Sequence, residues 1–195
     1  MAIDAVGKKI IALLQQDGRM ALINIGENLQ TKKKEKYSHV SVRKRLNHLV
    51  QEDLIRVQAT VNLQKFGVVF GLIMLSVDNP NDIESLIDKY KNCPRVLFLF
   101  PTVGHFNLVC GFYAENMQEA ESYLNFCSIK NEPGVRLVDL SFSTKNFHPG
   151  FFAIHPIGTN DQVISPCSRN CGSCSGYANK TCTGCPRFQG YRGSF

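Results

Sequence analysis

The sequence predicts an α+β protein with an N-terminal helix-turn-helix unit of winged character, a ferredoxin-like β-α-β-β-α-β domain and a small cysteine-rich tail. Three observations predict this division. Apolar residues first follow helical spacing, strand and helix patterns then alternate, and cysteines finally crowd together at the end of the chain. The expected boundaries are 1–60, 61–146, 147–166 (a linker arm) and 167–195.

The first domain is expected to hold three short helices followed by a strand. Asp17-Gly18 closes the first helix, and Ser38 is well placed as the N-cap of the third. A strand over 55–63 would leave the third helix and give the unit its winged character. The helices are marked by apolar residues three or four positions apart: Ile3, Val6, Ile10, Leu13 and Leu14; Leu22, Ile25 and Leu29; Val42, Leu46 and Leu49.

The second domain is expected to be an antiparallel sheet with two helices on one face. Asn79-Pro80 opens the first of these helices, and Pro133-Gly134 leads into the last strand. The predicted strands are 68–77, 96–100, 106–113 and 135–143, and the helices carry Ile83, Leu86, Ile87 and Tyr90, then Met117, Ala120, Tyr123, Leu124 and Cys127.

Composition limits the class of protein. The chain has 195 residues, 44% of them hydrophobic and 19% charged, which excludes wholesale disorder. No apolar run approaches the ~20 residues that span a bilayer. The start, Met-Ala-Ile-Asp, lacks the basic head of a secretory signal. We therefore expect a cytoplasmic protein with no membrane partner.

The net charge of +6 is concentrated in the first domain. Residues 1–60 hold 11 Lys and Arg against 6 Asp and Glu, whereas the other 135 residues hold 11 against 10. A basic unit on an otherwise balanced chain favours a polyanionic partner, most often nucleic acid. A well-solvated basic surface is the alternative.

Five short motifs stand in register with these elements. The first is the stretch 10–19, which ends in Asp17-Gly18-Arg19. The others are Ser38-x3-Val42-x2-Arg45-Leu46-x2-Leu49 with Ile55 after it, Cys93-Pro94-Arg95-Val96, Gly104-His105-Phe106-Asn107, and Pro133-Gly134-Val135. Over positions 3 to 146 they resemble the Lrp/AsnC (feast/famine) family of transcription regulators, and the stretch 10–19 resembles the first helix of that family. The resemblance implies double-stranded DNA as a partner, a homodimer that can build octamers, and a small-molecule effector.

The third helix is the expected DNA reader. With Val42, Leu46 and Leu49 facing inward, the opposite side of the helix presents polar donors to the major groove. Arg45 lies on the inner flank, and we interpret it as structural. A lysine-rich insert precedes the helix and suits phosphate contact, because lysine is a flexible point charge. The predicted DNA-binding residues are Lys32, Lys33, Lys34, Lys36, Ser38, His39, Ser41, Arg43, Lys44, Asn47 and His48.

By resemblance, the turn between the two central strands lines an effector site, with Thr102, Val103, Gly104, His105, Phe106 and Asn107 as its residues. Backbone N–H groups of a glycine-bearing turn can hold a carboxylate. Asn107 stands where the family has an acid, which removes the charge expected to meet an amino group. A plain β-turn without a ligand is the alternative.

The tail carries the most specific chemical signal, the spacing Cys167-x3-Cys171-x2-Cys174-x7-Cys182-x2-Cys185. Two CxxC pairs turn four thiolates toward one point, which suits Zn(II) or an iron–sulfur cluster. Zinc needs only the two pairs. We favour a [4Fe–4S] cluster, since a zinc knuckle has no role for a run of three cysteines such as Cys167, Cys171 and Cys174. Disulfides or reactive free thiols are the alternative.

These features together predict a DNA-binding regulator, not an enzyme, in which the cysteines sense metal or redox state or brace the assembly. Two other functions remain open. The spacing of Cys167, Cys171 and Cys174 also occurs in radical S-adenosylmethionine enzymes, so a small iron–sulfur electron carrier or radical enzyme is one. An effector-binding oligomer without a DNA role is the other.

Overall fold

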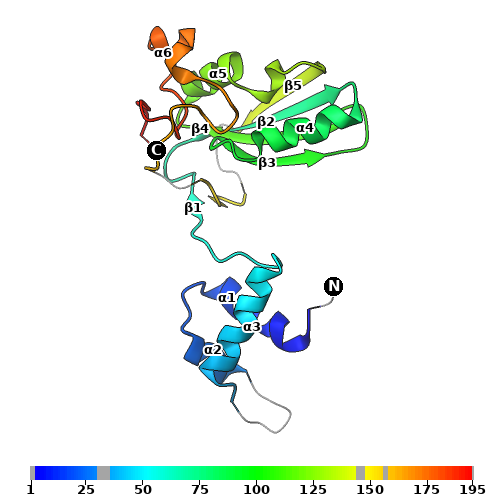
Figure 1. The fold of residues 1–195 in the computed structure, drawn as a ribbon, viewed down its shortest axis with the longest axis vertical. Helices are drawn as coiled ribbons and strands as arrows, with labels where there is room; N and C mark the ends of the chain where they lie inside the picture. Colours follow the sequence, from blue (N-terminus) through cyan, green and yellow to red (C-terminus); the bar gives the residue numbers. More distant parts are fainter. Residues whose placement is uncertain (1–2, 30–35, 144–147, 156–157, 195) are drawn as a thin grey trace. The chain divides into compact units, whose positions relative to one another are not determined.

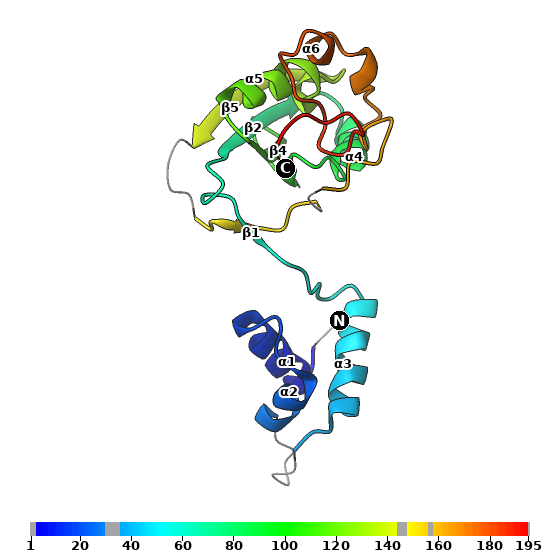
Figure 2. The ribbon, with the colours of Figure 1, turned by 90° about the vertical axis from the view of Figure 1, so that its left-hand side faces the viewer.

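The computed structural model describes residues 3–29, 36–143, 148–155 and 158–194. Figure 1 and Figure 2 follow the chain from two sides. The chain divides into two compact units, Met1–Ala59 and Thr60–Phe195.

The described residues of the first unit form three helices: α1 (Ala5–Gln16), α2 (Leu22–Asn28) and α3 (His39–Gln51). Side-chain caps begin two of them. Asp4 Oδ1 accepts a hydrogen bond from the Gly7 N–H at 2.6 Å, and Ser38 Oγ accepts one from the Ser41 N–H at 3.2 Å. The predicted N-cap Ser38 is confirmed. The buried core of the unit comes from predicted apolar positions: Ile10, Ile25, Leu29 and Val42.

Gly26 allows the segment before α3 to pass directly against α2. The Tyr37 N–H donates to the Gly26 carbonyl oxygen at 3.2 Å. A Cβ atom at Gly26 would lie 2.2 Å from the Tyr37 carbonyl oxygen, a backbone atom that cannot rotate away. A side chain at this position would therefore push α2 and the entry to α3 apart.

The strand expected over 55–63 is much shorter than predicted. Only β1 (Val61–Asn62) forms, and it pairs antiparallel with β6 (Phe151–Phe152) of the second unit. No strand lies in the described part of Met1–Ala59, so those residues do not form the predicted wing. A wing is a hairpin, in which two neighbouring strands pair with each other. Here β1 pairs with β6 instead, and both strands belong to the second unit.

The second unit is built on a four-stranded antiparallel sheet in the order β3-β4-β2-β5. Its elements follow the chain as β2 (Val69–Val77), α4 (Pro80–Tyr90), β3 (Val96–Pro101), β4 (Leu108–Ala114), α5 (Met117–Phe126) and β5 (Val135–Ser143). This order confirms the predicted ferredoxin-like β-α-β-β-α-β arrangement. Asn79 caps α4 with Pro80 at its first turn, as predicted.

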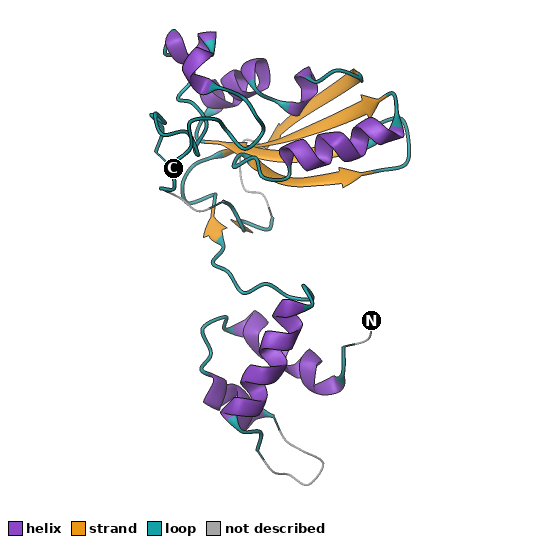
Figure 3. Ribbon diagram, viewed as in Figure 1, coloured by secondary structure: helices purple, strands orange, loops and turns teal. Residues whose placement is uncertain are grey.

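Both long helices contribute to one core against one face of this sheet, as Figure 3 shows with helices in purple and strands in orange. Ile73 and Leu75 of β2 are fully buried and belong to the same core cluster as Leu86 of α4 and Tyr123 of α5. The other face is less covered. There Phe98 and Phe100 of β3 stack with ring centroids 4.8 Å apart.

The C-terminal residues pack onto this unit. Two short helices, η2 (Cys171–Ser173) and α6 (Ser175–Ala178), lie in the tail. Cys167 is 4% exposed and Phe188 is 8% exposed, so burial against the sheet domain helps to order a segment with few apolar residues. No helix over the described ranges has the length and apolarity that crossing a bilayer requires.

Candidate functional site

The outer side of α3 is polar and exposed. Val42 and Leu49 are buried beneath it, while Lys44 and Asn47, three residues apart, lie next to each other on the free side. His48 Nδ1 lies 3.9 Å from Glu52 Oε1. Ser41 is half-buried, and the other predicted DNA-contact residues in and before α3 are exposed: Ser38, His39, Arg43, Lys44, Asn47 and His48.

Arg45 has a partner inside the first unit. Its Nη1 atom lies 2.6 Å from Asp4 Oδ2, and its guanidinium lies 6.0 Å from the ring centroid of Tyr37. Because Asp4 also caps α1, this contact ties α3 to the start of α1. The Gly7 N–H and then Arg45 hold the pKa of Asp4 below its usual value. Arg45 is thus turned toward the body of the unit.

The lysine-rich insert falls largely outside the described residues. Lys32, Lys33 and Lys34 lie there, so their predicted phosphate contacts stay a prediction. Lys36 is described, and its Nζ atom lies 3.0 Å from Glu27 Oε1 at the surface. This exposed ion pair is weak and leaves Lys36 accessible.

The predicted effector turn, residues 102–107, joins β3 to β4. The side chain of Asn107 makes two hydrogen bonds to the backbone of β2. Its Nδ2 donates to the Val77 carbonyl oxygen at 2.7 Å, and its Oδ1 accepts from the Val77 N–H at 2.8 Å. Thr102 Oγ1 donates to the Phe106 carbonyl oxygen at 2.8 Å. Val103 is fully exposed. Asn107 therefore serves the fold, and the effector site predicted at this turn stays a prediction.

The tail cysteines gather at the C-terminal end of α5. A cavity of about 330 Å³ is lined by five thiols, those of Cys127, Cys171, Cys174, Cys182 and Cys185. A neighbouring cavity of about 30 Å³ shares four of these thiols and adds two more, Cys93 and Cys167. The spacing had predicted the tail thiols. It missed Cys127 and Cys93, which look like ordinary core residues in the sequence and reach the site only through the fold.

Cys167 differs from the other tail cysteines. It belongs to the buried core cluster of the second unit, and its Sγ atom lies 3.4 Å from Ser165 Oγ. It does not line the larger cavity. Packing in the core thus gives Cys167 a structural role. The preference for a [4Fe–4S] cluster over zinc was based on counting Cys167 as a ligand together with Cys171 and Cys174.

Backbone N–H groups point at two of the sulfurs. The Gly184 N–H donates to Cys182 Sγ at 3.4 Å, and the Cys185 N–H donates to Cys171 Sγ at 3.3 Å. Burial raises the pKa of the Cys185 thiol to about 12 and raises the pKa of Cys171 and Cys182 as well. Burial thus disfavours the charged form of these thiols more than the two backbone donors favour it.

The side chains that the structure describes form no group of three or more His, Cys, Asp or Glu that could hold a metal ion. Their positions therefore do not support the metal centre predicted from the cysteine spacing, which stays a prediction.

A buried arginine, which the sequence analysis did not identify as a site residue, holds two glutamates that bind the tail. Arg95 is 4% exposed, and its guanidinium pairs with Glu115 at 2.9 Å and Glu119 at 3.6 Å. Glu119 Oε2 accepts a hydrogen bond from Thr183 Oγ1 at 2.7 Å, and Glu115 accepts one from the Tyr191 hydroxyl. Its only sequence signal was a charged residue within an apolar stretch, after Cys93-Pro94.

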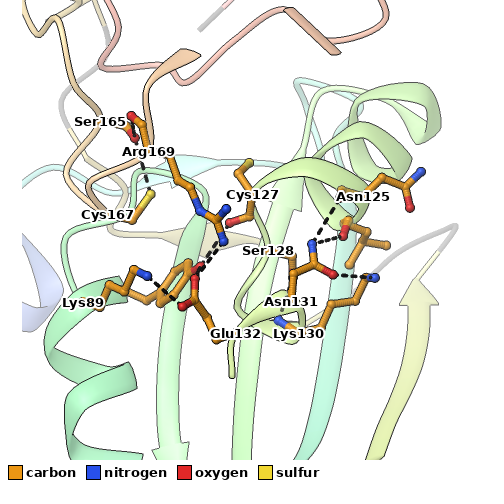
Figure 4. Close-up of polar contacts among 12 residues, drawn as sticks. Lys89, Asn125, Cys127, Ser128, Lys130, Asn131, Glu132, Ser165, Cys167 and Arg169 are labelled. Carbon is orange, nitrogen blue, oxygen red and sulfur yellow. Dashed lines mark hydrogen bonds and ion pairs between the residues drawn. The ribbon is translucent and has the colours of Figure 1, made fainter. Parts of the chain in front are cut away.

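Glu132 forms a second link between the tail and the domain (Figure 4). Lys89 of α4 lies 2.7 Å from its Oε2, while Tyr90 and Arg169 donate to its Oε1 at 2.7 and 2.8 Å. Burial alone would raise the pKa of Glu132, but these three donors outweigh it and hold the pKa below its ordinary value. The Glu132 cluster thus joins α4, the loop before β5 and the tail.

Known proteins similar to this chain are transcription regulators. An uncharacterized HTH-type transcriptional regulator of Pyrococcus horikoshii is 27% identical over 123 residues, which are 63% of this chain and 74% of that protein. No protein-family model matches the chain.

Solved structures match the fold over most of the chain. AsnC of E. coli superposes with a TM-score of 0.58 at 17% identity, over 75% of this chain and 95% of that one. A Neisseria meningitidis transcriptional regulator, crystallised as a complex with L-Met, matches with a TM-score of 0.59 at 18% identity over 80% and 98%. The helical first unit followed by the β3-β4-β2-β5 sheet with α4 and α5 is thus the fold of the Lrp/AsnC transcription regulators.

Proposed function

We propose that this protein is a sequence-specific DNA-binding transcription regulator that acts as a dimer or a higher oligomer. The observation that carries the proposal is the exposed polar side of α3, whose opposite side is buried in the first unit. Related chains that are named HTH-type transcriptional regulators support it.

On this side of α3, Lys44 and Asn47 are the base-reading residues in the proposal. Lysine donates to guanine O6 and N7, and asparagine pairs in two-pronged fashion with adenine N6 and N7. Arg43 and His48 flank them and reach bases or phosphates. Arg45 reads no base, because its guanidinium faces Asp4. Lys32, Lys33, Lys34 and Lys36 contact the phosphate backbone without reading sequence.

The open face of the sheet supports self-association in the proposal. Phe100 is 55% exposed on this face, and its ring stacks on that of Phe98. The Phe98 ring in turn lies over Gly111 of β4, where a Cβ atom would come within 2.3 Å of the ring. Such a flat aromatic surface is costly in water. Pairing of two sheets through this face gives the dimer, and two-fold symmetry then presents two α3 helices to a duplex.

The proposal includes two ligand responses. A small-molecule effector at the turn 102–107 is supported by the neighbour crystallised with L-Met, and here backbone N–H groups hold its carboxylate. Metal or redox state of the tail cysteines is the second input. It alters DNA affinity only if the two states of the tail favour different arrangements of the dimer.

Binding to selected duplexes tests the DNA-binding proposal. A duplex is first enriched from a random pool with the full chain, and fluorescence anisotropy then compares it with a scrambled duplex of equal length. Lys44→Ala and Asn47→Ala should each weaken binding to the enriched duplex by about tenfold, because a side chain that reads a base contributes about 1–3 kcal/mol. Lys9→Ala, an exposed lysine of α1, is the matched control and should leave affinity within about twofold. Equal affinity of the wild type for both duplexes would contradict sequence-specific binding.

A further inference from the structure

We propose that Cys171, Cys174, Cys182 and Cys185 bind a soft metal as thiolates, as one zinc ion or as the iron of an iron–sulfur cluster, and that this centre fastens the tail to α5. The inference does not depend on DNA binding, since every group involved belongs to the second unit.

The four thiols line one cavity from two turns. Cys171 and Cys174 lie at the ends of the η2 turn, where the Cys174 N–H donates to the Cys171 carbonyl oxygen at 3.1 Å. Cys182 and Cys185 flank Gly184, whose φ of +96° lets the backbone reverse tightly. The cavity that they share has a volume of about 330 Å³. It therefore has room for the thiols to converge on an ion or a cluster.

Backbone donors connect the two cysteine turns. The Cys185 N–H donates to Cys171 Sγ at 3.3 Å and so joins the second cysteine pair to the first across 14 residues. The Gly184 N–H donates to Cys182 Sγ at 3.4 Å. Each turn therefore directs a sulfur toward a backbone donor beside the shared cavity.

The fold also separates ligands from neighbours. Cys167 is 4% exposed within the core cluster, and its Sγ atom lies 3.4 Å from Ser165 Oγ, so it is left out of the ligand set although it lines the smaller cavity. Cys127 lines that cavity from α5 but lies in no CxxC pair. It forms the wall of the site, on the side where the tail meets the domain.

The tail contacts flank the proposed ligands in the chain. Ser122 Oγ of α5 donates to the Thr181 carbonyl oxygen at 2.5 Å, and Glu119 Oε2 of α5 accepts from Thr183 Oγ1 at 2.7 Å. Thr181 and Thr183 stand on either side of Cys182. A metal that fixes Cys182 therefore fixes both contacts, and it supplies the order that so few apolar residues cannot.

Elemental analysis of the full chain, purified without oxygen from cells given zinc and iron, tests the proposal. We expect about one zinc or about four irons per chain, the latter with a brown colour. Cys174→Ala and Cys182→Ala should each lower the bound metal at least tenfold. Ser173→Ala, on the same turn, and Cys110→Ala, in the sheet core, are the matched controls and should keep it. Circular dichroism of each variant shows that the sheet domain has folded.

Two further measurements decide the ligand set and the role of the site. Cys167→Ala should retain the metal, and its loss would overturn the assignment of the four ligands. Hydrogen exchange of 171–185 should be at least tenfold faster after chelation, with β2 and β4 unchanged. A chain that holds neither metal, or whose four thiols form two disulfides instead, would overturn the proposal. So would unchanged metal content in Cys174→Ala and Cys182→Ala.

Discussion

The side-chain amide of Asn107 pairs with both backbone groups of Val77, its Nδ2 with the carbonyl oxygen at 2.7 Å and its Oδ1 with the N–H at 2.8 Å. The amide thus acts as one more rung of the ladder between β2 and β4 beyond Leu75, which pairs with Leu108. An aspartate could accept from the N–H but would face the carbonyl oxygen with a second acceptor.

We therefore expect Asn107→Asp to destabilise the second unit by about 1–3 kcal/mol, the usual cost of leaving a buried polar group without its partner. Urea unfolding followed by circular dichroism measures the change. Val103→Ser, at a fully exposed position of the same turn, should change stability by less than about 0.5 kcal/mol. Equal stability of Asn107→Asp and the wild type would show that the two Val77 contacts contribute nothing.

The Glu132 cluster makes stability depend on pH. Because Lys89, Tyr90 and Arg169 hold the folded-state pKa of Glu132 below its ordinary value of 4.5, the carboxylate stabilises the fold above that pH. The contribution is lost as the pH falls through the lowered folded-state value. Glu132→Gln should cost about 2 kcal/mol at pH 7, and the gap to the wild type should close below pH 4.5.

Unfolding free energies of both proteins between pH 3 and pH 7 measure this gap. Glu121→Gln, at an exposed position of α5, is the control and should give no such gap. A difference between Glu132→Gln and the wild type that stays constant across the range would contradict the ionic origin of the effect.

Gly26 and Gly18 are a matched pair in the first unit. A Cβ atom at Gly26 would lie 2.2 Å from the Tyr37 carbonyl oxygen, whereas one at Gly18 meets only the Leu14 carbonyl oxygen at an ordinary 3.7 Å. Gly26→Ala should lower the stability of the first unit by about 2 kcal/mol or more, since backbone must move. Gly18→Ala should stay within about 1 kcal/mol. Hydrogen exchange of α1 to α3 separates the two, and similar protection in both variants would contradict the steric argument.

Phe100 tests the proposed dimer surface. A charge placed at this exposed aromatic would be buried without a partner if two sheets meet there, so Phe100→Asp should shift the protein to a monomer. Sedimentation at several concentrations measures the mass. Val163→Asp, at a residue 59% exposed outside the sheet, is the control and should keep the assembly of the wild type. An unchanged mass for Phe100→Asp would place the interface elsewhere.

The lysine-rich insert should act through the salt dependence of DNA binding. Replacing its four lysines by glutamine should weaken binding to all duplexes alike and lower the slope of log affinity against log salt by about 0.9 for each phosphate that is no longer neutralised. The mutated residues are Lys32, Lys33, Lys34 and Lys36. A control with the same change of charge replaces Lys65, Lys91, Lys130 and Lys180 of the second unit. A weakening restricted to the enriched duplex would contradict the phosphate role.

Much of the architecture follows from local patterns. Helical spacing around Ile10 and Ile25, the cap at Ser38 and the Asn79-Pro80 start of α4 are each decided within a few residues, because caps and amphipathic faces act locally. The strand predicted over 55–63 failed for the opposite reason. Val61–Asn62 became a strand by pairing with Phe151–Phe152, and such a partner, about 90 positions away, leaves no mark on the local pattern.

The candidate site divides in the same way. Spacing within the chain was enough to single out the CxxC pairs and the polar side of α3, since both depend on residues a few positions apart. Only the tertiary structure decided that Cys167 belongs to the core, that Cys127 faces the tail thiols and that Arg45 turns toward Asp4. Those contacts join residues about 40 or more positions apart, and the energy that selects them comes from burial and charge pairing between elements, which exists only once the chain has folded.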